Sequence, residues 1–306
     1  MKKFATVALT LAMAATAACA SATTVGICQL VQHEALDAAT QGFKDALTEK
    51  MPDVKFDEQN AAGDAATCVT ITSKFAADGV DLILANATSP LQAAVSATGD
   101  IPILGTSITD YATALGMKEW DGTTGINVSG TSDLAPLDGQ AAMIQELFPD
   151  AKNIGLVYCS AEANSVYQVT TIKGYLEEMG YTCTEFAFTD SNDVASVTQT
   201  AADASDVIYI PTDNTAAAYT ETIANVLIPA KVPAVVGEEG ICKGCGVATL
   251  TISYYDLGYK TGEMAYDILA NGADVSTMKV ESAPNFTKKY NAANVEALGL
   301  TIPADY

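Results

Sequence analysis

Short runs of consecutive apolar residues alternate along this chain with longer stretches in which apolar residues recur at helical spacing. One run, at 80–84 (VDLIL), is typical of a strand that is buried on both faces of a parallel sheet. Small and hydroxylated residues follow at 87–89, and Pro90 suits the first turn of a helix. A buried strand that leads into a helix N-terminus presents free backbone N–H groups at its carboxyl end, where open α/β sheets bind ligands.

The same pattern occurs a second time. Residues 205–215 (SDVIYIPTDNT) align with the first run at a constant offset, so that Asp81 matches Asp206 and Thr88 matches Asp213. Neighbouring segments repeat as well: 101–107 matches 232–238, and 25–30 matches 154–159. This internal repeat predicts an α/β protein made of two Rossmann-like lobes with a ligand cleft between them.

The N-terminus carries the pattern of a signal peptide. Two lysines precede an apolar run at 4–15, and a small-residue cleavage site follows at 20–22, so we expect residues 1–22 to be removed on export. Residues 16–19 also resemble a lipobox, in which Cys19 would be acylated, although Thr16 replaces the usual leucine. Two locations therefore remain open: periplasmic, or anchored as a lipoprotein to the outer face of the cytoplasmic membrane.

Composition excludes several classes of function. The formal net charge is −22, so the protein repels nucleic acid and anionic lipid. All 15 basic residues are lysines, and the absence of arginine counts against a pocket for phosphate, sulfate or dicarboxylates. The chain has no G-x-S-x-G and no nucleotide-binding glycine motif, and its single histidine, His33, disfavours a catalytic triad. We expect a non-enzymatic protein without cofactor or bound metal.

The mature chain contains an even number of cysteines, which in an exported protein predicts disulfides. We expect Cys159 to pair with Cys183 on adjacent strands and the C-x-x-C at 242–245 to close a tight loop, which leaves a third pair. Redox or zinc chemistry is the alternative for the C-x-x-C, but further ligands are lacking. In a cell that lives without oxygen all six would be thiols: Cys28, Cys68, Cys159, Cys183, Cys242 and Cys245.

Polar residues at the predicted strand ends differ between the two lobes. The first lobe offers neutral groups, namely Gln32, Thr88, Ser89, Thr106 and Ser107. The second offers acids and amides, namely Glu162, Asn164, Ser165, Asp213, Asn214 and Glu238. Hydroxyls and helix N-termini suit a carboxylate, whereas carboxylates suit an ammonium group, so the set predicts a zwitterion such as an amino acid. Two alternatives remain: these residues act only as helix N-caps, or they bind the hydroxyls of a sugar.

Several segments together resemble a known family, although none is sufficient alone. They are 26–43 (GICQLVQHEALDAATQGF), 127–134 (NVSGTSDL), 161–165 (AEANS), 211–215 (PTDNT), 256–269 (DLGYKTGEMAYDIL) and 297–303 (ALGLTIP). With the signal peptide, the mature chain resembles class I substrate-binding proteins of ABC importers, in particular the family that includes tryptophan- and phenylalanine-binding receptors.

The resemblance implies a fold, a ligand and a partner. The first lobe would contain 23–129 plus 253–276, and the second 130–252 plus 277–306. The implied ligand is an aromatic amino acid, and the implied partner is the membrane permease of an ABC importer, with the receptor itself a monomer. A sugar or nucleoside-type receptor and a sensor for a membrane signalling protein are the alternatives. Candidate aromatic residues for the cleft are Tyr111, Trp120, Tyr158 and Tyr254.

Overall fold

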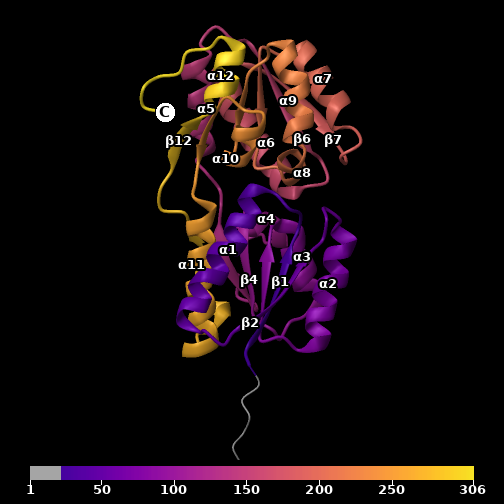
Figure 1. Ribbon diagram of the computed structural model, residues 1–306, viewed down its shortest axis with the longest axis vertical. Helices are drawn as coiled ribbons and strands as arrows, with labels where there is room; N and C mark the ends of the chain where they lie inside the picture. Colours follow the sequence, from indigo (N-terminus) through magenta and orange to yellow (C-terminus); the bar gives the residue numbers. More distant parts are fainter. Residues whose placement is uncertain (1–21) are drawn as a thin grey trace, which may run out of the picture.

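The computed structural model describes residues 22–306, which form two α/β lobes placed one above the other (Figure 1). The expected signal peptide, apart from Ala22, and the candidate lipidation site Cys19 lie outside the described residues. Each lobe contains one six-stranded sheet. The predicted two-lobed α/β fold is confirmed.

The first sheet has the strand order β11-β5-β4-β3-β1-β2, and all its pairs are parallel. Its strands are β1 (Thr24–Gln29), β2 (Lys55–Asn60), β3 (Leu82–Asn86), β4 (Ile103–Ile108), β5 (Val128–Ser132) and β11 (Glu281–Ser282). The helices of this lobe are α1 (Glu34–Lys50), α2 (Ala65–Asp78), α3 (Thr88–Ala97), α4 (Tyr111–Leu115) and α11 (Tyr254–Asn271), followed by the 3-10 turn η1 (Val275–Thr277).

The second sheet has the order β12-β10-β9-β8-β6-β7, in which only β12 is antiparallel to its neighbour. Its strands are β6 (Asn153–Cys159), β7 (Thr182–Phe188), β8 (Val207–Ile210), β9 (Ala234–Val236), β10 (Ala248–Thr251) and β12 (Thr287–Tyr290). The helices are α5 (Leu137–Leu147), α6 (Ala163–Glu178), α7 (Val194–Ala204), α8 (Asn214–Ala218), α9 (Thr220–Ala230), α10 (Glu239–Gly244) and α12 (Ala292–Leu298).

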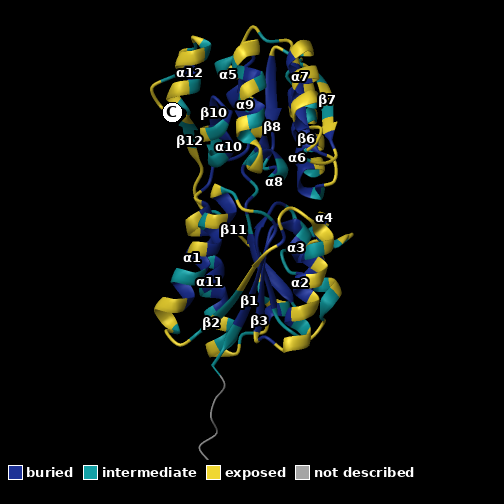
Figure 2. Cartoon of the chain, turned by 45° about the vertical axis from the view of Figure 1, so that its right-hand side comes forward, coloured by how far each residue is buried: buried dark blue, intermediate teal, exposed yellow. Residues whose placement is uncertain are grey.

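The two lobes share one topology, as the repeat predicts. The order β2-β1-β3-β4-β5 of the first lobe corresponds strand for strand to β7-β6-β8-β9-β10 of the second. The central strands are buried and helices cover both faces of each sheet, as the burial colours show (Figure 2). In such sheets the strand order reverses beside the first strand, and ligands bind at the carboxyl ends of the strands next to that point. The carboxyl ends of β1 and β6 are therefore the expected binding edges.

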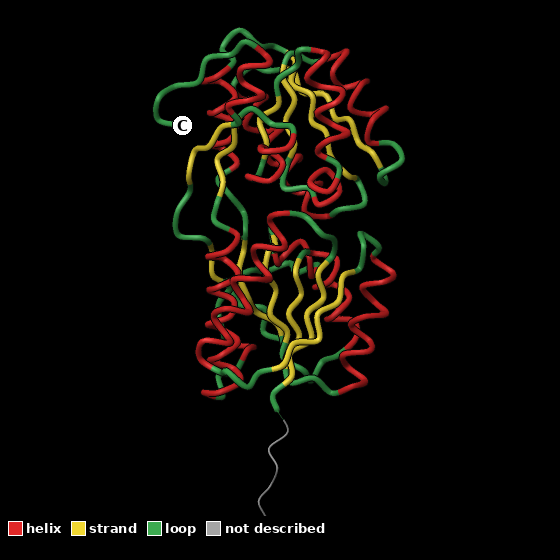
Figure 3. The backbone as a smooth tube through the Cα atoms, in the orientation of Figure 1, coloured by secondary structure: helices red, strands yellow, loops and turns green. Residues whose placement is uncertain are grey.

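The chain passes between the lobes at three places, and two of them differ from the expected boundaries. The crossings lie between β5 and α5, between β10 and α11, and between β11 and β12. We expected the first lobe to end at 129 and the tail from 277 to belong to the second lobe. Instead, the whole of β5 pairs in the first sheet, and β11 adds to it because Glu281 and Ser282 pair with Thr131 and Ser132. Figure 3 shows connecting segments passing along one side of the molecule.

The predicted return of helix α11 to the first lobe depends on close packing against α1. Gly258 and Gly262 face α1, and a Cβ atom on either would collide with the backbone at Ala39 or Phe43. Gly42 on α1 is equally close to the backbone of α11 at Tyr255. These glycines allow the two helices to approach at backbone distance.

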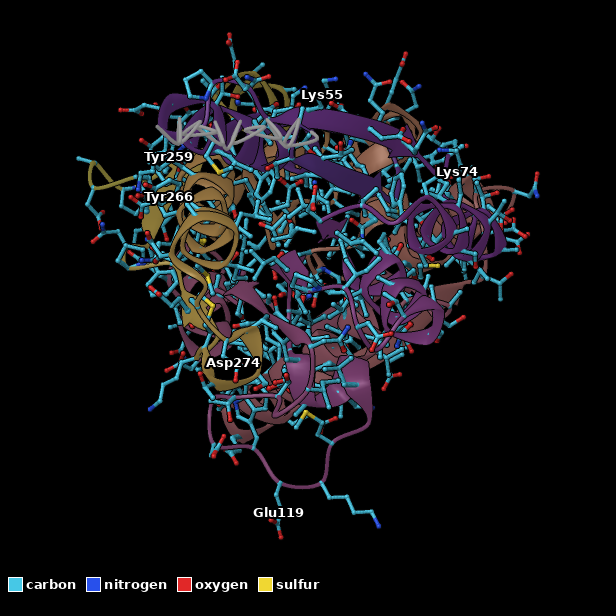
Figure 4. All side chains as sticks on the ribbon, turned by 90° about the horizontal axis from the view of Figure 1, so that it is seen from below. Lys55, Lys74, Glu119, Tyr259, Tyr266 and Asp274 are labelled. Atoms are coloured by element: carbon cyan, nitrogen blue, oxygen red, sulfur yellow. The ribbon has the colours of Figure 1, made fainter. Side chains whose placement is uncertain are left out.

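Some local features do not follow from the hydrophobic pattern. Val69 is an apolar residue of α2, yet it is 50% exposed. The segment 109–125 begins with α4, which the side chain of Asp110 caps by accepting a hydrogen bond from the Thr113 N–H. The following loop places Glu119 at a tip that projects from the lobe (Figure 4). The short helices α8 and α10 and the strand β12 were not predicted, because such short elements carry too few residues to show a period.

The cysteines do not form the expected disulfides. All six in the described chain are free thiols. Cys183 lies opposite Ile154, whereas Cys159 lies opposite Phe188. Five residues at roughly 3.3 Å each separate the two cysteines along the strands, and a disulfide cannot span that distance. The C-x-x-C forms the last turn of α10 rather than a loop, and Cys28 contacts Cys68 as a thiol.

Among residues 22–306, no helix combines the length and apolar character that a membrane span needs.

Candidate functional site

A small cavity of about 10 Å³, enough for one water-sized group, lies between the lobes, and we call it the inner cavity. It is lined from the first lobe by His33, Ala35, Leu36, Ser107, Thr109, Asp133 and Tyr254, and from the second by Asn164, Thr212, Asp213, Asn214, Ala217 and Glu238. A second hollow between the lobes, the outer groove, shares Asn214 with it. The outer groove includes the apolar side chains of Leu30, Val31 and Tyr219.

Two residues at the carboxyl ends of first-lobe strands have unusual backbone conformations, and one of them, Ser107, lines the inner cavity. Ala87, directly after β3, has φ 101°, and Ser107, near the end of β4, has φ 56°. Both values lie in regions that L-residues rarely adopt, and such strain concentrates at ligand sites. The hydroxyl of Ser107 is buried, has no hydrogen-bond partner among the residues that the structure describes, and belongs to the wall of the inner cavity. Ser107 therefore offers the inner cavity an unused hydroxyl group.

Asp213 is the most buried acid of the second-lobe wall, with 1% exposure. Its carboxylate accepts hydrogen bonds from the Cys159 N–H at 2.6 Å, the Ser165 hydroxyl at 2.7 Å and the Ala216 N–H at 2.8 Å. It thereby caps α8 and holds the end of β6. Burial, with a contribution from the nearby charge of Glu162, raises the pKa of Asp213 to about 7. Asp213 is both a structural cap and a candidate ligand for a cation.

Glu238 occupies the equivalent position after β9. Its side chain caps α10 by accepting from the backbone N–H groups of Gly240 and Ile241. Burial raises the pKa of Glu238 to about 7 in spite of these hydrogen bonds. Its neighbour Glu239 instead pairs with Lys243 and Lys289. Only Glu238 lines the inner cavity, because Glu239 already begins α10 and its side chain reaches these lysines instead.

Asp133 is a wall residue that the sequence did not identify. It lies in the crossing after β5, accepts hydrogen bonds from the Tyr254 phenol at 2.8 Å and from Thr109 at 3.2 Å, and is 4% exposed. Burial raises the pKa of Asp133. Because Tyr254 begins α11, this hydrogen bond joins two of the three crossing segments. Asp133 is not among the strand-end residues that the internal repeat aligns. The one feature of the sequence that could have indicated it is its position within the segment 127–134, which resembles the family.

Glu162 has a different role from the other acids. Its carboxylate accepts hydrogen bonds from the Asn214 N–H and side-chain amide and from the backbone and hydroxyl of Thr215. It also accepts from the Asn164 amide at 3.1 Å. Glu162 lines the outer groove and not the inner cavity. Its many internal partners make it the group that orients Asn164 and Asn214.

The structure brings only part of the predicted set together. Ser107, Asn164, Asp213, Asn214 and Glu238 line the inner cavity, and Ser89 and Glu162 line the outer groove. Gln32 is exposed at the rim beside His33. The remaining three are buried elsewhere than in the cavity walls: Thr88 begins α3, Thr106 contacts Thr131 within the first sheet, and Ser165 supports Asp213.

The candidate aromatic residues separate in the same way. Tyr254 lines the inner cavity. Tyr111 donates to the Gly105 carbonyl inside the first lobe, and Trp120 stacks on it from the surface with 41% exposure. Tyr158 donates to Glu185 within the second lobe. Tyr219, which lines the outer groove, was missed, although it follows the 211–215 segment closely.

Charge in the inner cavity is unbalanced. Asp133, Asp213 and Glu238 are all nearly buried, and among residues 22–306 no lysine lines the inner cavity or the outer groove. Buried carboxylates without a cation are unfavourable, which is why their pKa values are raised. A ligand that carries an ammonium group would supply the missing charge.

These raised pKa values predict that the ligand-free protein loses stability as pH increases. In the folded protein Asp213 and Glu238 titrate at about 7, whereas in an unfolded chain such groups titrate at about 4. The folded state therefore binds more protons, and stability falls as pH rises through this interval. The pKa of His33 is lowered in the folded protein, so His33 makes stability fall as pH decreases. This opposite effect sets in only below about pH 6.5, where the histidine of an unfolded chain binds a proton. Thermal unfolding at about pH 6.5 and pH 8 tests this, and an equal or higher Tm at pH 8 would contradict it.

Side-chain contacts join the two lobes around the cavity. His33 Nε2 contacts Asn214 Oδ1 at 3.2 Å, and the Gln168 amide donates to Thr109 at 3.2 Å. At the rim, Lys243 of the second lobe pairs with Glu34 of the first. The lobes are therefore in contact across the cleft, in a closed arrangement.

Removing the rim ion pair should have a small effect. The side chains of Lys243 and Glu34 are 55% and 52% exposed, and pairs of this kind contribute at most about 1 kcal/mol. We expect Lys243→Met to weaken ligand binding less than about fivefold, as measured by titration calorimetry at low and high salt. A loss of about a hundredfold would show instead that this pair controls closure.

Comparisons with known proteins agree with this geometry. A family model described as ABC transporter substrate binding protein matches residues 24–305. A tyrosine-binding protein of Clostridioides difficile is 36% identical over 280 residues, which cover 90% of this chain and 81% of that protein. A solved structure from Streptococcus pneumonia, described as an ABC domain in complex with L-Trp, is 33% identical with a TM-score of 0.88, over 93% of this chain and 97% of that one.

A third comparison concerns the position of the lobes. The ligand-free, open structure of a substrate-binding protein with adhesive properties from Clostridium difficile is 38% identical and covers 92% of this chain and 97% of that one. Its TM-score is nevertheless only 0.70. The complex with L-Trp is less similar in sequence but superimposes better. The lobes of this chain therefore lie nearer to the arrangement in that complex than to the open one.

Proposed function

The chain belongs to the family of ABC transporter substrate-binding proteins, and from that premise we propose that it binds a free aromatic amino acid between its lobes. Proteins of this family are components of transporters and not enzymes, and they work with a membrane permease. Relatives described as binding tyrosine and L-Trp support the choice of ligand. The single observation that carries the proposal is the group of buried acids in the inner cavity with no lysine beside them.

In this proposal the charged end of the ligand lies in the inner cavity and its ring lies in the outer groove. The ammonium group lies in the inner cavity near Asp133, Asp213 and Glu238. The Ser107 hydroxyl, which has no partner, donates to the carboxylate from the first lobe. The aromatic ring extends into the outer groove, where Leu30, Val31 and Tyr219 offer apolar surface. Because groups of both lobes contact the ligand, binding would favour closure.

The location and assembly state form part of the same proposal. The receptor is exported by its signal peptide and acts outside the cytoplasmic membrane as a monomer. Whether Cys19 carries a lipid or is removed with residues 1–22 decides between an anchored and a soluble form. Mass spectrometry of the protein isolated from its own cells distinguishes an acylated N-terminal cysteine from a free N-terminus near Thr23.

A thermal-shift panel tests the ligand class. The twenty amino acids and common sugars are added to the mature protein, and a ligand present at 100 times its Kd adds about 2.7 kcal/mol of stability. That corresponds to a rise in Tm of several degrees for a chain of this size. We expect a shift with Trp, Phe or Tyr and none with sugars. A shift with sugars alone would overturn the proposal.

Two matched analogues test the assignment of the ligand's ends. Phenylpropionate lacks the ammonium group of phenylalanine, and phenylalanine amide lacks its carboxylate. Both should bind at least about tenfold more weakly than phenylalanine, because a charge-assisted hydrogen bond contributes about 1.5–3 kcal/mol. If phenylpropionate bound as tightly as phenylalanine, the acids would not contribute to ligand binding. The protein would then be a receptor for aromatic carboxylates.

A further inference from the structure

The single histidine of the chain occupies an unusual place in the cleft. His33 precedes α1 and lines the inner cavity from the first lobe. Its Nδ1 atom is buried and has no hydrogen-bond partner within the described part of the chain, and its side chain does not cap α1. A buried polar atom without a partner is unfavourable, so one at a ligand cavity indicates a group that the ligand satisfies.

A chain of hydrogen bonds determines which proton His33 carries. Glu162 accepts from the Asn214 N–H at 3.0 Å and from the Asn214 side-chain amide at 2.7 Å. Since a carboxylate can only accept, the amide nitrogen of Asn214 faces Glu162 and its Oδ1 faces His33. This Oδ1 also only accepts, so the His33 Nε2 that contacts it at 3.2 Å carries the hydrogen. In the neutral ring Nδ1 is then an acceptor.

The surroundings keep the ring neutral near pH 7. Burial lowers the pKa of His33, and this effect exceeds the opposing influence of the Asn214 contact and of the Glu162 and Asp37 carboxylates. The other charged groups at this part of the cleft are Glu34 on α1, paired with Lys243 at the rim, and the wall acids Asp133, Asp213 and Glu238. The Asp37 carboxylate already accepts from Gln29.

We propose that neutral His33 accepts, through Nδ1, a hydrogen bond from the ammonium group of the bound amino acid, and so helps to select ligands with a free amino group. The proposal rests on the proposed function. The lone pair of Nδ1 repels a carboxylate oxygen and attracts an N–H donor, so it identifies which end of the zwitterion lies beside it. His33 thus adds a first-lobe contact, beside Asp133, to an ammonium group that Asp213 and Glu238 of the second lobe also hold, and so links ammonium recognition to closure.

Nitrogen NMR of protein labelled with ¹⁵N-histidine tests the tautomer directly, because the chain contains only one histidine. We expect a protonated Nε2 and an unprotonated Nδ1 at pH 7, with the Nδ1 signal shifting when phenylalanine or tyrosine is added. A protonated Nδ1 in the complex would overturn the proposal. A Nδ1 signal that does not respond to a bound amino acid would overturn it as well.

A matched pair of ligands separates recognition from a structural role. In His33→Gln the side-chain amide can still reach Asn214 but the acceptor at the δ position is lost. We expect its affinity for phenylalanine to fall about tenfold while its affinity for phenylpropionate stays within about twofold of wild type. An equal loss for both ligands would show that His33 only supports closure. If no amino acid binds the wild-type protein, the proposed function itself fails, which is a different result.

Discussion

Replacement of Asp133 by asparagine should weaken binding of the amino acid at least about 30-fold, or about 2 kcal/mol. Asparagine keeps the shape of the side chain: its amide oxygen can accept from Tyr254, and its NH2 group can donate to the Thr109 hydroxyl in place of the bond that Thr109 donates to Asp133. The substitution removes the negative charge. An ammonium group that is buried against a neutral amide loses the charge-assisted part of its hydrogen bond. Titration calorimetry at pH 8 measures the change.

The same substitution should raise the stability of the ligand-free protein at pH 8. Asp133 is buried without a basic neighbour, and burial raises its pKa, so its ionised form costs free energy until the ligand arrives. The opposite signs of the two effects distinguish Asp133 from a merely structural residue. Asp138→Asn, on the exposed start of α5, is the matched control and should change neither quantity. Wild-type affinity in Asp133→Asn would exclude Asp133 from the site.

Asp213→Ala should abolish measurable binding and also lower the Tm of the ligand-free protein by about 5–10 °C. The loss of stability is expected because alanine would leave the buried N–H groups of Cys159 and Ala216 and the Ser165 hydroxyl without their acceptor. Loss of a helix N-cap alone costs about 1 kcal/mol, and each unsatisfied buried group costs about 1–3 kcal/mol. Circular dichroism melts and calorimetry at a temperature where the variant is folded separate the two effects.

Asp206 provides the control for Asp213. It lies at the opposite end of the same strand region and accepts from the backbone N–H groups of Lys152 and Asn153 at 2.9 and 2.8 Å. Asp206→Ala removes comparable backbone hydrogen bonds far from the cavity, so we expect a modest loss of Tm and unchanged affinity. If both variants lost affinity equally, the effect at Asp213 would reflect stability and not ligand contact.

The part of the site that follows strands could be predicted, because parallel strands direct their carboxyl ends to one edge. Ser107, Asp213, Asn214 and Glu238 were identified in this way and line the inner cavity. Thr106, predicted by the same rule, does not line the cavity: its hydroxyl accepts a hydrogen bond from Thr131 within the first sheet. Asp133 was not identified from the sequence because it lies in a crossing segment. The path of that segment depends on how the lobes are joined and not on the periodicity of apolar residues.

The sequence by itself determined the two-lobed α/β fold, because buried strands and amphipathic helices leave distinct periods and the two halves repeat them. It also determined the acidic character of the second-lobe wall, because the residue type by itself decides whether a side chain is acidic. Only the tertiary structure decided which polar groups remain available to a ligand. Glu162 and Ser165 are engaged by other residues of the second lobe, whereas the Ser107 hydroxyl and His33 Nδ1 are left without partners. The physical reason is that hydrogen-bond satisfaction depends on contacts between distant segments, which no local pattern encodes.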